Sequence, residues 1–148
     1  MTVMTIPGSL FNAPKGSILI HACNTKGVWG TGIAKEFAER FPEAYEQYKN
    51  HCRTHTADEL IGTCFLIEDK EYFIACLFTS IGYGEYKDTP EKILINTKSA
   101  VDDLITKNIS SQKLHSCRIN SGRFAVPWED TKRILEESKF LFVVHEVQ

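Results

Sequence analysis

Residues 19–34 read LIHACNTKGVWGTGIA, and this stretch decides the fold because it passes from an apolar strand through a loop into a helix. Glycines stand at positions 27, 30 and 32 of the loop. A loop of this kind points backbone N–H groups and a positive helix end toward an anion, most often a phosphate. The glycine spacing matches neither GxGxxG nor a P-loop. Taken alone, the pattern is equally consistent with a purely structural turn.

A second loop of the same kind occurs later in the chain. Residues 114–119 are predicted to form a strand and residues 128–138 a helix, and NSGRFAVP at residues 120–127 lies between them. Ligands of open α/β sheets bind at the carboxyl ends of the strands. We therefore expect two anion-binding loops at the same end of one sheet, an arrangement that fits a diphosphate.

Strand-like and helical segments alternate along the rest of the chain, which is typical of an α/β or α+β sandwich. The apolar patterns predict strands at 2–6, 17–22, 60–67, 72–79, 114–119 and 140–147, and helices at 33–41, 42–52, from 89 through 104, and at 128–138. The polar EDKE at residues 68–71 predicts a hairpin between two of these strands. Because no repeat or linker interrupts this order, we expect one domain over residues 1–148.

Composition excludes several classes of function. The 148 residues are 43% apolar and 24% charged, as in ordinary soluble domains. A net charge of -2 without a basic stripe argues against binding to nucleic acid. The apolar stretches fall short of the ~20 residues that span a bilayer, and the amino terminus does not resemble a secretory signal. We expect a protein of the cytoplasm, with the nucleus as an alternative.

The metal-ligand signals are weak. Five cysteines without a CxxC pair favour neither a disulfide framework nor a cysteine zinc site, and indicate a reducing compartment. His51 and His55 are four residues apart and can share a helix face. Because no third ligand is evident beside them, the solvated end of a helix is the favoured interpretation. We expect no metal and no cofactor.

The two loops resemble those of the macrodomain family. The family's first loop typically runs from Asn-Ala-Ala-Asn to a Gly-Gly-Gly-Val run, and HACN at 21–24 and GTGI at 30–33 are similar to it. Its second loop is usually Ser-Thr-Gly-Ile-Tyr-Gly-Tyr-Pro, which residues 120–127 resemble. PGSLF at 7–11 is similar to the family's Gly-Asp-Ile turn. The resemblance implies a three-layer α/β/α sandwich around a mixed sheet of about six strands.

Within the family, the sequence most resembles a fungal group of phosphatases. The blocks that carry this likeness are residues 19–24, 29–34, 76–80 and 119–128. The resemblance implies hydrolysis of ADP-ribose 1''-phosphate, a by-product of tRNA splicing, to ADP-ribose and phosphate. It implies a small-molecule substrate, with an ADP-ribosylated protein as an alternative partner, and we expect a monomer.

The resemblance also assigns roles to individual residues. His21 and Asn24 are the candidate catalytic residues, since an imidazole transfers protons near neutral pH and the matching family asparagine contacts the distal ribose. The alternatives are a satisfied core histidine and an asparagine that only caps the turn. The candidate substrate-binding residues are Ser9, Leu10, Trp29, Gly30, Thr31, Gly32, Ile33, Ala34, Asn120, Ser121, Gly122, Arg123, Phe124 and Ala125.

Two departures from the family bear on the reaction. Ala34 and Phe124 stand where two groups of macrodomain hydrolases carry their catalytic aspartates, so those routes for removing ADP-ribose from proteins are disfavoured. Ser9 replaces the aspartate that usually bonds the adenine amino group. A non-catalytic module that binds ADP-ribose, and an ADP-ribosyl hydrolase that uses other groups, therefore remain alternatives to the phosphatase.

Overall fold

The computed structural model describes residues 2–147 and contains a six-stranded sheet in the order β1-β6-β5-β2-β4-β3. The strands are β1 (Val3–Pro7), β2 (Ile18–Asn24), β3 (Cys64–Asp69), β4 (Tyr72–Ser80), β5 (Leu114–Ser116) and β6 (Phe142–Glu146). Neighbouring strands are parallel except β3 and β4, which form an antiparallel hairpin. The predicted mixed sheet and the predicted hairpin are confirmed.

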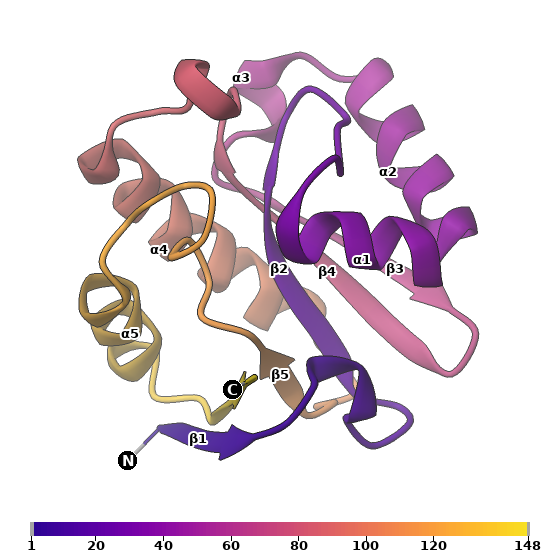
Figure 1. The fold of residues 1–148 in the computed structure, drawn as a ribbon, viewed down its shortest axis with the longest axis vertical. Helices are drawn as coiled ribbons and strands as arrows, with labels where there is room; N and C mark the ends of the chain where they lie inside the picture. Colours follow the sequence, from indigo (N-terminus) through magenta and orange to yellow (C-terminus); the bar gives the residue numbers. More distant parts are fainter. Residues whose placement is uncertain (1, 148) are drawn as a thin grey trace.

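Helices cover both faces of this sheet, as Figure 1 shows. The helices are α1 (Gly32–Arg40), α2 (Pro42–Arg53), α3 (Ala57–Leu60), α4 (Pro90–Lys107) and α5 (Trp128–Glu137), with short 3-10 turns η1 (Leu10–Asn12) and η2 (Gly84–Tyr86). The pair α1 and α2 lies on one face and the pair α4 and α5 on the other, which confirms the three-layer sandwich. Within residues 2–147, no helix is long and apolar enough to cross a membrane.

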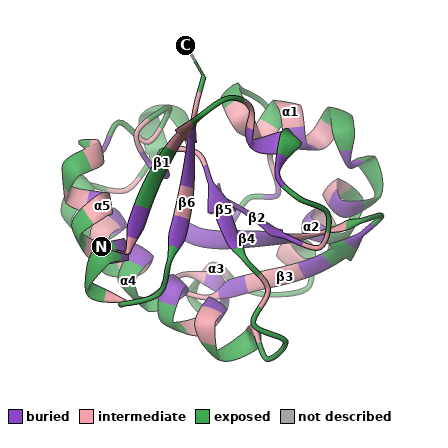
Figure 2. Ribbon diagram, turned by 90° about the horizontal axis from the view of Figure 1, so that it is seen from below, coloured by how far each residue is buried: buried purple, intermediate pink, exposed green. Residues whose placement is uncertain are grey.

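Each face of the sheet has its own hydrophobic core. Successive residues of β2 alternate between the two cores. Leu19 packs with Phe37 of α1 and Tyr48 of α2. Ile20 belongs to the core on the opposite face, which includes residues of α4 and α5. The central strands are buried on both faces, in contrast to β1 at the edge (Figure 2). Full burial of each large apolar side chain stabilises the fold by about 1.5–3 kcal/mol. Because both faces of β2 are buried, the carboxyl end of this strand is held in a fixed position at the edge of the sheet.

The structure corrects two predicted boundaries. The expected strand at 60–67 begins only at Cys64, because Leu60 ends the additional helix α3. A capping box starts this helix: the Thr56 hydroxyl accepts from the Glu59 N–H at 3.2 Å, and the Glu59 carboxylate accepts from the Thr56 N–H at 2.7 Å. The strand expected at 114–119 ends at Ser116, so the second loop begins earlier than predicted.

Of the two histidines near the end of α2, His51 packs against the sheet, whereas His55 is exposed. The His51 ring stacks on Phe65 with centroids 3.8 Å apart, and His55 lies 4.3 Å from His51 by the same measure. Burial and the neighbouring His55 lower the pKa of His51. The sequence placed these histidines at the solvated end of a helix, and α2 does end at Arg53. His51, however, packs on Phe65 and is only partly exposed to solvent.

A buried histidine pair joins β5 to β6. His115 Nδ1 lies 2.8 Å from His145 Nε2, and each residue is only 6% exposed. At this distance one nitrogen donates and the other accepts, so the pair requires at least one neutral ring. Burial lowers the pKa of both rings, and the neighbouring His145 lowers that of His115 further.

We expect this pair to make the fold sensitive to acid. As pH falls below the ordinary histidine pKa of 6.5, the unfolded chain takes up protons that the folded pair resists. The contribution of the pair to stability is therefore complete above pH 6.5 and decreases as pH falls below it. Between pH 7.5 and 5.5, we expect the Tm of the wild type to fall on the order of 2–4 °C more than that of the His115→Gln, His145→Gln double variant. Equal slopes in the two proteins would contradict this assignment.

Candidate functional site

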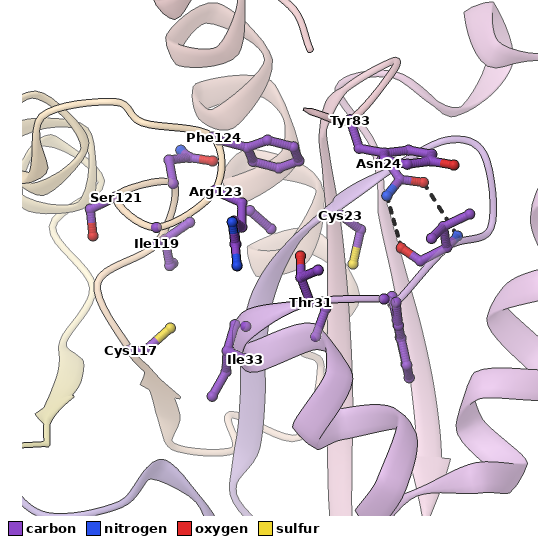
Figure 3. A pocket seen from close by; sticks show the side chains of 18 of the residues that line it. Cys23, Asn24, Thr31, Ile33, Tyr83, Cys117, Ile119, Ser121, Arg123 and Phe124 are labelled. Carbon is purple, nitrogen blue, oxygen red and sulfur yellow. Dashed lines mark hydrogen bonds between the residues drawn. The ribbon is translucent and has the colours of Figure 1, made fainter. Parts of the chain in front are cut away.

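A cleft of about 610 Å³ opens between the loop that follows β2 and the loop that follows β5. Because β2 and β5 are parallel neighbours, their carboxyl ends and both loops meet at one edge of the sheet. Figure 3 shows side chains from both loops around this space. The cleft is lined by these predicted residues: Asn24, Trp29, Gly30, Thr31, Gly32, Ile33, Ala34, Asn120, Ser121, Gly122, Arg123 and Phe124. The two predicted loops thus form one wall each.

The first loop is organised by Asn24. The Asn24 side-chain Oδ1 accepts from the Lys26 N–H at 2.9 Å, and its Nδ2 donates to the Val28 carbonyl at 2.8 Å. The Tyr48 hydroxyl donates to the Asn24 carbonyl at 2.6 Å and lies 3.1 Å from Oδ1. Asn24 therefore holds the turn, as the structural alternative proposed, and it also lines the cleft.

The loop ends at the amino terminus of α1. Thr31 precedes this helix with an extended backbone and makes no side-chain capping bond. The first N–H groups of a helix have no partner within the helix. Gly32, with φ of 59°, Ile33 and Ala34 all line the cleft. The N–H groups of the first turn of α1 are therefore donors available to an anion in the cleft.

The second loop is anchored by Asn120. This residue has φ of 69° and is 5% exposed. Its Oδ1 accepts from the Thr79 hydroxyl at 3.0 Å, and its Nδ2 donates to the Thr97 hydroxyl at 2.9 Å. Its carbonyl accepts from the Val126 N–H at 2.9 Å. The side chain thus bonds to the protein, and Asn120 contributes to the cleft by fixing the loop rather than by offering its amide to a ligand.

His21 is not among the residues that line the cleft, and its catalytic role stays a prediction. The ring is fully buried and stacks on Phe37 with centroids 4.0 Å apart and planes 9° apart. Trp29 packs against the ring edge at 4.9 Å. The ring points to the face that α1 and α2 cover, where Phe37 and Trp29 enclose it, and along β2 the lining of the cleft begins only at Ala22. The interpretation as a core histidine is the one that the geometry supports.

His21 belongs to a buried group with Cys23 and Cys76. Their donor atoms all lie within 4.8 Å of one another. The Cys23 sulfur lies 3.6 Å from Nε2 and 3.8 Å from Nδ1 of His21. At these distances the thiol packs directly against the imidazole.

The two cysteines of this group differ in acidity. Burial opposes ionisation of Cys23, but the neighbouring Cys76 thiol and the charge and hydrogen bonding of His21 lower the pKa of Cys23 to about 5. Burial raises the pKa of Cys76, and the neighbouring Cys23 raises it further. Ionisation is therefore confined to Cys23, which lines the back of the cleft.

Three other predicted residues lie outside the lining of the cleft. The Ser9 hydroxyl caps η1 by accepting from the Phe11 N–H at 3.2 Å, and Leu10 is buried in the core. Ala125 has φ of 57° and closes the second loop through a 3.1 Å bond from its N–H to the Gly122 carbonyl. In the structure these residues cap, pack and close a turn, and their contact with a ligand stays a prediction.

The structure adds residues that the sequence did not indicate. Tyr83, from the segment after β4, lies beside Asn24 at the rim of the cleft (Figure 3). Arg118 lines the cleft from the first part of the second loop and forms an ion pair with Glu146 of β6. The remaining additions are Ala22, Cys23, Val28, Cys117 and Ile119. Tyr83 could have been found from topology alone, because β4 is a parallel neighbour of β2 and ends at the same edge.

The charge of the cleft favours an anionic ligand. Among the lining residues of the described chain, Arg118 and Arg123 are cationic and none is a carboxylate, while the acidic thiol of Cys23 is buried. Backbone N–H groups at the start of α1 add to the positive character. The exposed part of the cleft therefore combines cations and N–H donors without a carboxylate, which suits phosphate groups.

Fold and cleft together define a class of protein: a three-layer α/β/α sandwich with two glycine-containing loops at the carboxyl ends of adjacent parallel strands. The model of the Macro domain family matches residues 20–135. This chain therefore belongs to the macrodomain family, as its loop sequences indicated.

Its relatives and structural neighbours agree with this membership. The ADP-ribose 1''-phosphate phosphatase of Chaetomium globosum is 40% identical over 147 residues, which cover 87% of this chain and 80% of the relative. The phosphatase of the same name from Candida albicans is 40% identical over 150 residues, covering 91% and 92%. The macrodomain of Mycobacterium tuberculosis DarG has a similar fold, with a TM-score of 0.78, 21% identity and coverage of 97% and 96%.

Proposed function

We propose that this chain hydrolyses ADP-ribose 1''-phosphate to ADP-ribose and inorganic phosphate. The observation that carries the proposal is its 40% identity, over most of both chains, to fungal phosphatases named for this substrate. The blocks that resemble the fungal group include both loops of the cleft. The residues that would hold this substrate thus lie within the blocks that resemble the fungal phosphatases.

The geometry of the cleft supports this substrate. A volume of about 610 Å³ lies within the range of sites that bind cofactor-sized molecules. The start of α1 and the second loop would hold the diphosphate between them. Because the family's counterparts of Asn24 and Phe124 contact the distal ribose, the 1''-phosphate would lie near these residues and Tyr83.

Within this arrangement, the protein acts mainly by positioning and by charge. Water adds to phosphorus, the bond from phosphorus to the ribose oxygen breaks, and the leaving oxygen takes up a proton. N–H donors and arginines oriented in advance stabilise the charge that develops on the phosphoryl oxygens. The Asn24 amide has a second Nδ2 hydrogen that no acceptor within residues 2–147 uses, so it can donate to the substrate.

The decisive experiment is a phosphate-release assay with the purified protein. We expect phosphate from ADP-ribose 1''-phosphate and none from p-nitrophenyl phosphate, which lacks the diphosphate that the two loops would hold. Binding of the product ADP-ribose should be measured by calorimetry on the same preparation. Absence of turnover in protein that binds ADP-ribose would reject the phosphatase and favour the alternative below.

A non-catalytic ADP-ribose module is the second candidate. It is favoured by Ala34 and Phe124, which line the cleft without offering an acid or base. An ADP-ribosyl hydrolase acting through other groups is a third candidate, tested by release of ADP-ribose from modified glutamate. Because the phosphatase would also bind its product, only turnover measurements separate these candidates.

The cellular setting follows from the proposed substrate. We propose that the substrate arises as a by-product of tRNA splicing, and that the protein acts as a monomer in the cytoplasm, with the nucleus as the alternative. Accumulation of ADP-ribose 1''-phosphate in cells that lack the protein would support this setting. A fluorescent fusion gives the location, and light scattering of the purified protein gives the oligomeric state.

A substitution at Gly82 tests whether the position of Tyr83 at the rim of the cleft matters for turnover. A Cβ at Gly82 would lie 2.4 Å from the Tyr86 carbonyl oxygen, so Gly82→Ala must displace the segment that carries Tyr83. We expect turnover to fall about tenfold, because small misplacements of a positioning group lower rates strongly. The control is Gly84→Ala, which meets no atom within 4 Å but strains a φ of +62°. Equal turnover in the two variants would count against a role for the rim.

A further inference from the structure

Arg123 occupies an unusual place between the two loops. It belongs to the second loop, yet its Cγ lies 4.0 Å from the point where a Cβ on Gly32 would stand. Figure 3 shows the side chain crossing the cleft toward the start of α1, with its nitrogens near Thr31 and Ile33. The side chain therefore spans the gap between the two loops that line the cleft.

The guanidinium of Arg123 has no opposite charge to neutralise it. Within residues 2–147 it forms no ion pair, whereas the other arginine of the cleft, Arg118, is paired with Glu146. No carboxylate lines the cleft in the described chain. An exposed arginine usually finds a partner or points into solvent, but Arg123 extends over a site that already favours anions.

We propose that the Arg123 guanidinium is an ionic clamp that closes over the diphosphate of the ligand and links the second loop to the start of α1 through it. The identity of the ligand rests on the function proposed above. A guanidinium presents parallel N–H donors that bind two phosphoryl oxygens at once, and a charge-assisted pair of this kind is stronger than a neutral hydrogen bond. Arg123 thus acts through its side chain, in addition to the backbone contacts expected of its loop.

If Arg123 acts as an ionic clamp, the affinity for the ligand depends on salt concentration. A side chain that acts only by packing gives no such dependence. An ion pair at the mouth of a cleft is screened by salt, because the Debye length falls from about 10 Å at 0.1 M to about 3 Å at 1 M ionic strength. Loss of the guanidinium should therefore weaken the affinity for the ligand and also make the remaining affinity less dependent on salt. A side chain that only fills space would leave the salt dependence unchanged.

The test is calorimetry of ADP-ribose with the wild type, Arg123→Met and Arg123→Lys at low and high salt. We expect Arg123→Met to bind 10- to 100-fold more weakly at low salt, with a smaller loss at high salt. Arg123→Lys should be intermediate, because it keeps the charge but not the paired donors. The matched control is Arg133→Met on the exposed side of α5, which should bind as the wild type does. Melting temperatures of all variants should agree, since both arginines are exposed.

Two results would overturn the clamp: wild-type affinity in Arg123→Met, or a loss of affinity that is equal at both salt concentrations. Titration with inorganic pyrophosphate separates the clamp from the proposed function. If pyrophosphate binds in an Arg123-dependent manner but ADP-ribose does not bind, the clamp stands and the proposed function fails. If neither ligand binds the wild type, both proposals fail.

Discussion

Replacing Asn24 with alanine is expected to lower the turnover of ADP-ribose 1''-phosphate by at least about 100-fold. The substitution removes an acceptor for the Lys26 N–H, a donor to the Val28 carbonyl and the donor proposed to reach the substrate. The first loop then loses the bonds that hold its shape, and the start of α1 is no longer fixed against the cleft. Leaving these partly buried groups unpaired should also lower the free energy of unfolding by about 1–2 kcal/mol.

Two further variants separate positioning of the loop from contact with the substrate. Tyr48→Phe keeps the aromatic packing but removes the hydroxyl that donates to the Asn24 carbonyl at 2.6 Å. If Asn24 acts only by holding the loop, this variant should lose turnover in proportion to its loss of stability. Asn24→Asp keeps the acceptor and removes the donor, so it should retain most of the fold but little turnover. Turnover of Asn24→Asp close to that of the wild type would reject a direct contact.

The sequence was sufficient for the parts of the fold that follow from local pattern. The run of apolar residues in β2 identified a central strand, and double burial confirms it. The glycines near residue 30 predicted a loop before α1, and that loop forms a wall of the cleft. These features depend on periodicity and backbone freedom, which neighbouring residues determine.

The sequence does not show what packs on each strand face. His21 follows the same pattern as a catalytic histidine at the end of a strand, but the sequence does not say which face of β2 α1 covers. Once Phe37 of α1 packs on that face, the imidazole is enclosed and Ala22 faces the cleft instead. Tyr83 was missed for the complementary reason: its segment carries no phosphate-loop pattern, and only the pairing of β4 with β2 brings it to the site.

Asn120 shows how a side chain can have a role that the loop motif does not indicate. The motif predicted a ligand contact through backbone N–H groups, and the structure adds that the Asn120 amide bonds to Thr79 and Thr97, while a third hydroxyl, that of Thr131, lies 3.4 Å from Nδ2. These threonines come from β4, α4 and α5. Such convergence is invisible in a linear motif, because it joins residues far apart in the chain.

We therefore expect Asn120→Ala to be among the most destabilising substitutions in the cleft. Loss of the amide leaves buried hydroxyls without their partner, which costs about 2–4 kcal/mol. Alanine also tolerates the φ of 69° less well than asparagine, at a further cost of about 1 kcal/mol. Because whole domains are stable by only about 5–15 kcal/mol, the midpoint of urea unfolding should shift strongly, and turnover should fall as the second loop loosens.

Asn120→Gly separates the two contributions, since glycine accepts a positive φ but cannot restore the hydrogen bonds. We expect this variant to recover about 1 kcal/mol relative to Asn120→Ala and no more, apart from the small entropic cost of glycine in the unfolded chain. Full recovery of stability in Asn120→Gly would mean that backbone conformation, and not the link among β4, α4 and α5, holds the second loop. Recovery of turnover without recovery of stability would show instead that the loop keeps its shape through the backbone bond to Val126 alone.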